Sequence, residues 1–258
     1  MNNLNLKNTA ESLIDTFLKA GKIAKEISER GVKITIKSDK SPVTDGDLAV
    51  DKLLKAKINN CTPDIPIISE ETVDLKIDND SKNFWLIDPI DGTRDYINKR
   101  DEYTLNAALI INLKPVIGII YAPAKDRLFF SYGKNLAYEI SEGKEKSLNC
   151  EKKNKNEIIG LENSGSTPTE VLEIYKRYNV SRTIKMSSSL KFCILASGEA
   201  DIYAAKARAF EWDIAAGHTI LEHAGGTITT HEEREITYGK NQYKNPPIIA
   251  KRSKNLKE

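Results

Sequence analysis

The pattern of apolar and polar positions divides the chain into a helical start, a run of strands and a mixed second half. Between residues 8 and 30, apolar side chains recur every three or four positions, which predicts an amphipathic helix that ends at Gly31. Residues 32–37 alternate apolar with polar, as a half-exposed strand does. A polar loop over 38–47 follows, and a second helix is expected at about 46–59, with Thr44 or Asp45 as its cap. Its expected inner face consists of Leu48, Leu53, Leu54 and Ile58.

Short apolar runs predict a sheet in the first half. Residues 65–68 and 84–87 are expected to form buried strands, and a short helix is expected near 93–98. Turn residues then separate four further predicted strands, at 103–111, 115–121, 127–132 and 137–140. Such short breaks indicate an antiparallel meander. Residues 141–156 are charged and are expected to link the two halves, with an edge strand near 147–149.

In the second half, predicted strands and helices alternate. Strands are expected at 157–161, 183–186, 200–204, 227–230 and 247–251, and helices at 169–178, 189–197 and 212–224. This order indicates an α/β arrangement. We therefore expect an N-terminal α+β half over 1–150, which holds most candidate metal ligands, and a C-terminal α/β half over 151–258.

Composition narrows the classes of function. The net charge of +2 gives no strong field toward a nucleic acid polymer or a membrane. The three cysteines, Cys61, Cys150 and Cys193, fit neither a zinc site nor a disulfide framework, which favours the reducing cytoplasm. The N-terminal residues lack the apolar core of a signal peptide, and the apolar runs are too short to span a bilayer.

The most informative stretch follows the apolar run 84–87. Asp88 and Asp91 leave the end of that strand three positions apart, and Gly92 and Thr93 come directly after. Two carboxylates held close together repel each other unless a cation lies between them, and hard oxygen ligands suit Mg²⁺ or Mn²⁺. Backbone N–H groups at a helix start face anions such as phosphate. The stretch therefore predicts a metal-assisted phosphate site.

Further acids occupy the boundaries of other predicted elements. Glu70 and Glu71 follow the strand at 65–68, and Asp47 and Asp213 lie at helix starts. Each of them alone has an ordinary explanation as a turn, a cap or a solvated strand end. If the two strands are neighbours, however, Glu70 reaches the sheet edge that carries Asp88 and Asp91. Thr93 would then hydrogen-bond a metal-activated water, and Asp47 would accept the Thr93 proton.

Together these motifs resemble those of the inositol monophosphatase-like, lithium-sensitive, metal-dependent phosphatases. The matching stretches appear in the family's order and are PVTDGD (42–47), ISEE (68–71), WLIDPIDGT (85–93), EWDIAAG (211–217) and EHAGG (222–226). The resemblance implies a layered α-β-α-β-α sandwich with the site between the two halves. It also implies two or three Mg²⁺ ions per site, with Mn²⁺ as an alternative, and a small phosphorylated substrate.

The resemblance assigns a role to each matching position. The implied metal ligands are Glu70, Glu71 (for a third, weak metal), Asp88, the Ile90 carbonyl, Asp91 and Asp213. The implied catalytic residues are Asp47, Glu70 and Thr93, of which Thr93 and Asp47 orient the attacking water. The implied substrate contacts are Asp91, Gly92, Thr93, Ser188, Lys191 and Asp213.

Within this family, two stretches resemble the bacterial nucleotidases that remove the 3′-phosphate of adenosine 3′,5′-bisphosphate. They are GIIYAP (118–123) and SSSLKFC (187–193). One departure is Ala205, which stands where such nucleotidases usually carry an arginine, so Lys206 or Arg208 would have to reach the same phosphate.

Other readings stay open at this point. One is a phosphatase for inositol or another sugar phosphate, and another is a nucleotide- or metal-binding module without turnover. The resemblance also leaves open a homodimer and a weak peripheral association with the inner membrane.

Overall fold

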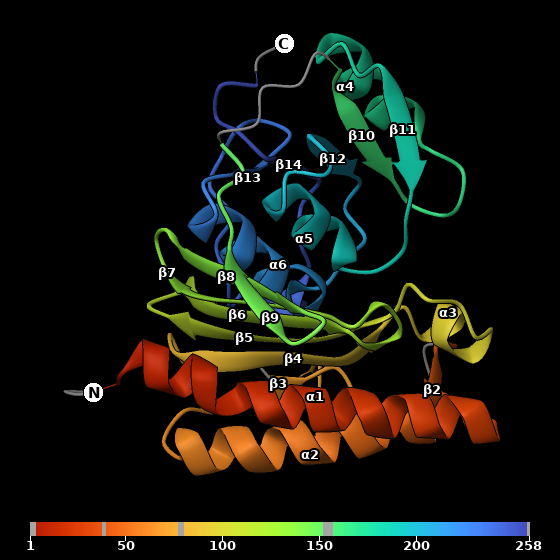
Figure 1. Cartoon of the computed structure of the whole chain (residues 1–258), viewed down its shortest axis with the longest axis vertical. Helices are drawn as coiled ribbons and strands as arrows, with labels where there is room; N and C mark the ends of the chain where they lie inside the picture. The colour runs from red at the N-terminus through yellow and green to blue at the C-terminus, as the bar shows by residue number, and fades with distance from the viewer. Residues whose placement is uncertain (1–3, 38–39, 77–79, 152–156, 257–258) are drawn as a thin grey trace.

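Two β-sheets alternate with three layers of helices in the computed structural model, which describes residues 4–37, 40–76, 80–151 and 157–256. From bottom to top in Figure 1, the layers are the α1–α2 pair, a first sheet, the α5–α6 pair, a second sheet and α4. This is the α-β-α-β-α sandwich that the family resemblance implied. The predicted division into halves at residue 150 stays a prediction, and residues 38–39 and 152–156 of the predicted loop and link lie outside the described residues.

The first layer consists of α1 (Leu6–Arg30) and α2 (Asp45–Cys61). Thr44 caps α2, and Gly31 ends α1 with a φ of 94°, as predicted. The predicted inner face of α2 was wrong at Leu48, which is 54% exposed. At about 100° per residue, Leu48 lies about 200° around the helix from Val50, which belongs to the buried stripe. That stripe consists of Val50, Leu54 and Ile58.

In the sequence between α1 and α2, β1 (Ile34–Ile36) and β2 (Pro42–Thr44) form an antiparallel hairpin. The strand β2 was missed in the sequence, where it was assigned to the polar loop. The prediction of a half-exposed β1 was also wrong, because Ile34 and Ile36 are 49% and 64% exposed. The reason is that β1 and β2 form a sheet of only two strands, separate from the two large sheets.

The first large sheet has the strand order β3-β4-β5-β6-β7-β8-β9. Its strand β3 runs parallel to β4, and all later neighbours are antiparallel, which confirms the predicted meander. Contrary to prediction, β4 does not end at Ile87 but continues through Pro89 to Asp91, with a shift of register between Asp88 and Asp91. The strands are β3 (Ile67–Ser69), β4 (Phe84–Asp91), β5 (Thr104–Ile111), β6 (Lys114–Ala122), β7 (Arg127–Gly133), β8 (Leu136–Ser141) and β9 (Lys144–Ser147).

The central helices α5 (Leu190–Ala196) and α6 (Glu211–His223) lie between the two sheets and are almost wholly buried. Gly118 of β6 allows α6 to approach the first sheet closely. A β-carbon at this position would overlap the carbonyl oxygen of Ala216 and lie 2.8 Å from the Cβ of Thr219. The position of α6 matters for the site, because α6 carries Asp213.

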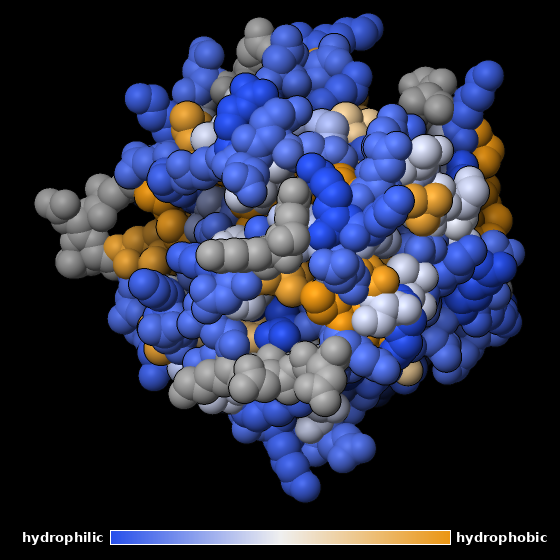
Figure 2. Space-filling view, turned by 90° about the horizontal axis from the view of Figure 1, so that it is seen from above, coloured by the Kyte–Doolittle hydropathy of each residue, from blue (hydrophilic) through white to orange (hydrophobic). Residues whose placement is uncertain are grey.

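The second large sheet has the strand order β11-β10-β12-β14-β13, and α4 (Thr169–Arg177) covers its outer side. Its strands are β10 (Ile159–Glu162), β11 (Arg182–Lys185), β12 (Ile202–Ala205), β13 (Thr227–Thr230) and β14 (Ile248–Lys251). The short helices are α3 (Thr93–Ile97) and two 3-10 turns, η1 (Pro123–Lys125) and η2 (Asn241–Tyr243). From above, the face is mostly hydrophilic, with apolar residues visible near its centre and toward its left and right edges (Figure 2).

Two further observations concern the chain as a whole. All three cysteines are free thiols, and Cys150 and Cys193 are buried. Among the described residues, no helix combines the length and apolar character needed to cross a membrane.

Candidate active site

Three carboxylates from three separate elements meet at the boundary between the first sheet and α6. Glu70 follows β3, Asp88 lies in β4, and Asp213 lies in the first turn of α6. One oxygen of each lies within 4.8 Å of the others. Glu70 reaches Asp88 because β3 and β4 are parallel neighbours, and the Glu70 N–H donates to the Ile87 carbonyl at 3.1 Å.

The electrostatics of this cluster favour a bound cation. Burial raises the pKa of Asp88 and of Asp213 well above the usual range, and the charges of Glu70 and Asp91 raise both further. Burial also raises the pKa of Glu70, to about 7. Asp88 is 2% exposed, and within the described residues its Oδ1 has no hydrogen-bond partner. An orphaned carboxylate oxygen among like charges fits a hard divalent cation such as Mg²⁺.

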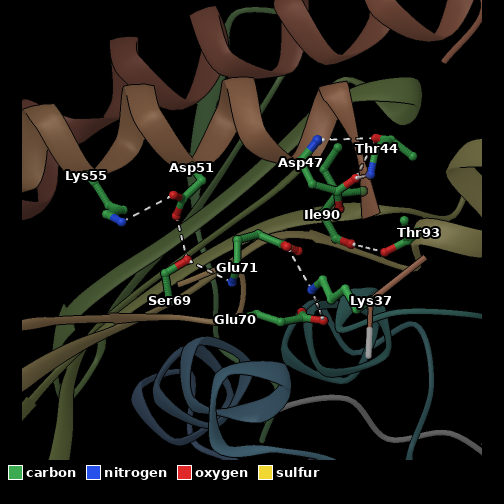
Figure 3. Close-up of polar contacts among 10 residues, drawn as sticks. All are labelled: Lys37, Thr44, Asp47, Asp51, Lys55, Ser69, Glu70, Glu71, Ile90 and Thr93. Atoms are coloured by element: carbon green, nitrogen blue, oxygen red, sulfur yellow. Dashed lines mark hydrogen bonds and ion pairs between the residues drawn. The ribbon is translucent and has the colours of Figure 1, made fainter. Parts of the chain in front are cut away.

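Lys37 supplies a positive charge to the same cluster. Its Nζ lies 2.7 Å from Oε2 of Glu71 and 3.6 Å from Oε1 of Glu70 (Figure 3). Burial lowers the pKa of Lys37, but the hydrogen bond to Glu71 and the charges of Glu70 and Glu71 outweigh it, so the pKa is raised. Sequence reasoning missed this role, because nothing in the alternating pattern of 32–37 distinguishes Lys37 from the other lysines.

The Glu70–Glu71 segment is anchored by α2. The Ser69 hydroxyl donates to Oδ1 of Asp51 at 2.5 Å, and the Glu71 N–H donates to Oγ of Ser69 at 3.4 Å (Figure 3). Asp51 also forms an ion pair with Lys55 at 3.3 Å. The sequence pattern gave no signal for this anchor beyond the position of Asp51 on the buried side of α2.

The predicted Thr93–Asp47 dyad stays a prediction. The Thr93 hydroxyl donates to the Ile90 carbonyl at 3.1 Å, and Oδ2 of Asp47 accepts from the Thr44 N–H at 2.8 Å and from the Thr44 hydroxyl (Figure 3). Asp47 is buried, and burial raises its pKa. Thr44 and Asp47 together cap α2, so the ordinary structural role of Asp47 is present.

Asp91 has a different hydrogen-bond partner from Glu70, Asp88 and Asp213. Its Oδ2 accepts from the N–H of Ser189, at 2.5 Å, and from the Ser189 hydroxyl. Gly92 follows with a φ of 89°, a left-handed conformation that favours glycine and that starts α3. The expected binding of phosphate by the Gly92–Thr93 turn stays a prediction.

A cavity of about 570 Å³ opens beside the carboxylates. Its volume is in the range of small-molecule sites. Glu70, Asp91 and Asp213 form an acidic part of its lining; the basic side chains are Arg94, Lys191, Lys206 and Arg208, and apolar ones include Phe210, Ile214 and Pro246. The cavity thus places acidic, cationic and apolar groups around one space.

Lys191 and Ser188, the predicted substrate contacts, both line this cavity. The Lys191 ammonium donates to the carbonyls of Ser188 at 2.6 Å and Met186 at 3.2 Å. Burial lowers its pKa to about 8. Ala205 also lines the cavity, and of the neighbouring cations Lys206 pairs with Glu170 at 2.8 Å, whereas Arg208 is exposed.

Comparison with known proteins identifies relatives over most of the chain. Residues 5–258 match the inositol monophosphatase family. A 3′(2′),5′-bisphosphate nucleotidase CysQ from Buchnera aphidicola (subsp. Acyrthosiphon pisum, strain APS) is 36% identical over 213 residues, which cover 82% of this chain and 79% of that relative. The CysQ of Escherichia coli (strain K12) is 30% identical over 212 residues, which cover 80% and 82%.

Solved structures agree with this assignment. CysQ from Bacteroides thetaiotaomicron superimposes with a TM-score of 0.82 and 30% identity, covering 96% of this chain and 98% of that one. An IMPase from Thermotoga maritima gives a TM-score of 0.74 with 22% identity, covering 93% and 90%, and therefore shows the likeness of fold alone.

Proposed function

This chain belongs to the inositol monophosphatase family, and from that premise we propose that it is a Mg²⁺-dependent phosphatase acting on adenosine 3′,5′-bisphosphate. It hydrolyses the 3′-phosphate and yields AMP and inorganic phosphate. The observation that carries the proposal is the meeting of Glu70, Asp88 and Asp213 beside a cavity that is also lined by basic side chains. The 30–36% identity to nucleotidases named CysQ supports the choice of substrate.

The proposed metal ligands come from both halves of the chain. Two or three Mg²⁺ ions would be held by Glu70, Glu71, Asp88, the Ile90 carbonyl, Asp91 and Asp213. When bound, the metal lowers the pKa of a coordinated water and screens the charge of the phosphate. Thr93 and Asp47 would orient that water for attack on phosphorus in line with the leaving 3′-oxygen. For this, the Thr93 hydroxyl would have to turn away from the Ile90 carbonyl, to which it donates at 3.1 Å.

The cationic part of the cavity suits a second phosphate. Lys191 is buried with its ammonium on backbone carbonyls, so a phosphate oxygen can add a charge-assisted bond. Arg208 lines the same cavity and takes over from the absent arginine at Ala205. Lys206 is the weaker candidate, because it already pairs with Glu170.

A second candidate substrate is an inositol or other sugar monophosphate; the observation on its side is Ala205, which leaves the site for a second phosphate dependent on Arg208 and Lys191. A binding module without turnover is disfavoured, because the carboxylate set is complete. We further propose a cytoplasmic location. A homodimer and a weak peripheral association with the inner membrane stay predictions from the resemblance.

The substrate is tested by phosphate release from adenosine 3′,5′-bisphosphate, inositol 1-phosphate and fructose 1,6-bisphosphate under identical Mg²⁺ conditions. We expect kcat/KM to be highest for the adenosine bisphosphate, by at least about tenfold, which corresponds to about 1.4 kcal/mol of transition-state binding. A preference for inositol phosphate would support the second candidate. Tight binding of all three without phosphate release would contradict the assignment as an enzyme.

A further inference from the structure

We infer that Ser189 is a positioning residue of the metal site, which fixes Asp91 of β4 against the start of α6. The inference rests on the proposed function, because it assumes that Asp91 and Asp213 bind the same group of cations. Its evidence is a set of contacts made by one buried serine, which lies in the SSSLKFC stretch but to which the sequence assigned no role.

Ser189 binds Asp91 through two donors. Its N–H lies 2.5 Å from Oδ2 of Asp91, and its hydroxyl donates to the same oxygen. In the described part of the chain both bonds go to Oδ2, which leaves Oδ1 of Asp91 available to a cation. Hydrogen bonds to an ionised carboxylate are about twice as strong as neutral ones, so they hold the orientation of the group.

The same hydroxyl also contacts the other half of the site. Oγ of Ser189 lies 2.8 Å from the backbone carbonyl oxygen of Asp213. On the other side, Nδ2 of Asn106 donates to Oγ of Ser189 at 2.8 Å. Ser189 and Asn106 are 2% and 1% exposed, so water does not compete for these bonds.

Asn106 extends the connection to Asp88. The two residues are directly paired in the β4–β5 register, and paired residues on antiparallel strands present their side chains to the same face of the sheet. Ser189 therefore joins four elements around the carboxylates, namely β4, β5, the start of α5 and the start of α6. The charge of Asp91 acts on the same cluster, because it raises the pKa of both Asp88 and Asp213.

The consequence is that Ser189 sets the distance and orientation between ligands that belong to different halves of the chain. Residues that orient metal ligands typically change metal affinity by about 10- to 100-fold when they are lost. The effect should appear in Mg²⁺ binding even without substrate, because the contacts concern the ligands and not the phosphate.

The direct test is calorimetric titration of Mg²⁺ into the full-length protein without substrate, with Ser189→Ala, Ser189→Thr and wild type compared. We expect Mg²⁺ binding to Ser189→Ala to be about 10- to 100-fold weaker, and Ser189→Thr, which keeps the hydroxyl, to stay within about threefold of wild type. Ser12→Ala is the control, because Ser12 is an exposed residue of α1 whose hydroxyl donates to the Thr9 carbonyl at 2.9 Å and lies 3.3 Å from Sγ of Cys61, and neither partner is a proposed metal ligand.

A kinetic measurement separates positioning from general destabilisation. For Ser189→Ala, the Mg²⁺ concentration at half-maximal rate should rise by the same factor, while kcat at saturating Mg²⁺ changes by less than about threefold. A lower melting temperature with unchanged Mg²⁺ affinity would overturn the inference. If wild type itself binds no Mg²⁺, the proposed function fails first, and the two failures are thereby distinguished.

Asn106→Ala keeps the test decisive if Ser189→Ala does not fold. This variant removes the donor to Ser189 and leaves the hydroxyl in place, so we expect a smaller loss of Mg²⁺ affinity, of about three- to tenfold. Unchanged affinity in a folded Asn106→Ala protein would contradict the proposed connection between β5 and Asp91.

Discussion

The ammonium of Lys37 lies 2.7 Å from the carboxylate of Glu71, whose side chain is 3% exposed. This pair brings the β1–β2 hairpin to the edge of the acidic cluster. Lys37 therefore offsets part of the repulsion among Glu70, Glu71 and their neighbours when no metal is bound, and it competes with a cation for the same carboxylates.

Substitution of Lys37 tests this competition. Without metal, Lys37→Met should lower the free energy of unfolding by about 1.5–3 kcal/mol, the contribution typical of a hydrogen bond to a charged group. The rise in melting temperature on adding Mg²⁺ should be larger than in wild type, since the cation then supplies the missing charge. Thermal unfolding with EDTA and with Mg²⁺ measures both effects. An unchanged Mg²⁺-induced shift would contradict the competition; Lys22→Met on the exposed side of α1 is the control.

The raised pKa of Glu70 predicts a pH dependence of stability. Because the folded pKa of about 7 exceeds the ordinary value of 4.5, the folded state binds more protons, and Glu70 makes the metal-free protein less stable as pH rises through this window. His223 acts in the opposite direction, since burial lowers its pKa to about 4. The contribution of Glu70 is therefore isolated by comparison with Glu70→Gln.

In EDTA, the melting temperature of Glu70→Gln minus that of wild type should increase from pH 5 to pH 8. Glutamine resembles the protonated acid and carries no charge to repel Asp88, so the variant gains relative stability as wild-type Glu70 ionises. A difference that stays constant or falls with pH would show that Glu70 is not part of a repulsive cluster.

Gly118→Ala should disturb the site from a distance. The new β-carbon would overlap the Ala216 carbonyl and push α6, which carries Asp213, away from the sheet. We expect a loss of about 1–3 kcal/mol in the free energy of unfolding, together with a higher Mg²⁺ requirement. Gly165→Ala is the control, because a β-carbon at this position would meet no heavy atom of the described residues within 4 Å, apart from its chain neighbours. Equal melting temperatures for the two variants would contradict the close packing of β6 on α6.

Lys191→Met tests the site for the second phosphate. Methionine keeps much of the buried volume but removes the charge, so KM for adenosine 3′,5′-bisphosphate should rise by about 10- to 100-fold, the equivalent of one charge-assisted bond. KM for adenosine 3′-monophosphate, which lacks the 5′-phosphate, should change by less than about threefold. Equal increases of KM for both substrates would mean that Lys191 contacts the 3′-phosphate or acts only through the stability of the fold.

The order of elements could be predicted from the sequence because the chain keeps a clear periodicity in α1, in the meander and in the second half. The predicted burial of Leu48 and Ile36 was wrong for one reason: the spacing of an apolar residue does not reveal whether a neighbouring element covers it. The continuation of β4 through Pro89 was missed because proline usually ends a strand pairing.

The acids of the site could be found because each follows a predicted strand or starts a predicted helix. The residues that hold them could not, since Lys37, Asp51 and Ser189 act through contacts between distant parts of the chain. Ser189 and Asp91 are 98 positions apart, and no local pattern links them. The Asp91 carboxylate is an example: its motif was plain in the sequence, but its partner was visible only in the fold.

The central claim is that the cluster around Asp88 binds the cation that drives phosphate release. The most direct measurement is the rate of phosphate release from adenosine 3′,5′-bisphosphate by wild type and Asp88→Asn, with Mg²⁺ and with EDTA, and with the exposed Asp64→Asn as control. We predict that EDTA abolishes the wild-type rate. Asp88→Asn should lose more than about 1,000-fold with Mg²⁺ because metal catalysis contributes several kcal/mol, while it stays folded and melts at a higher temperature in EDTA. An Asp88→Asn rate near that of wild type, in a protein that still binds Mg²⁺, would contradict the account.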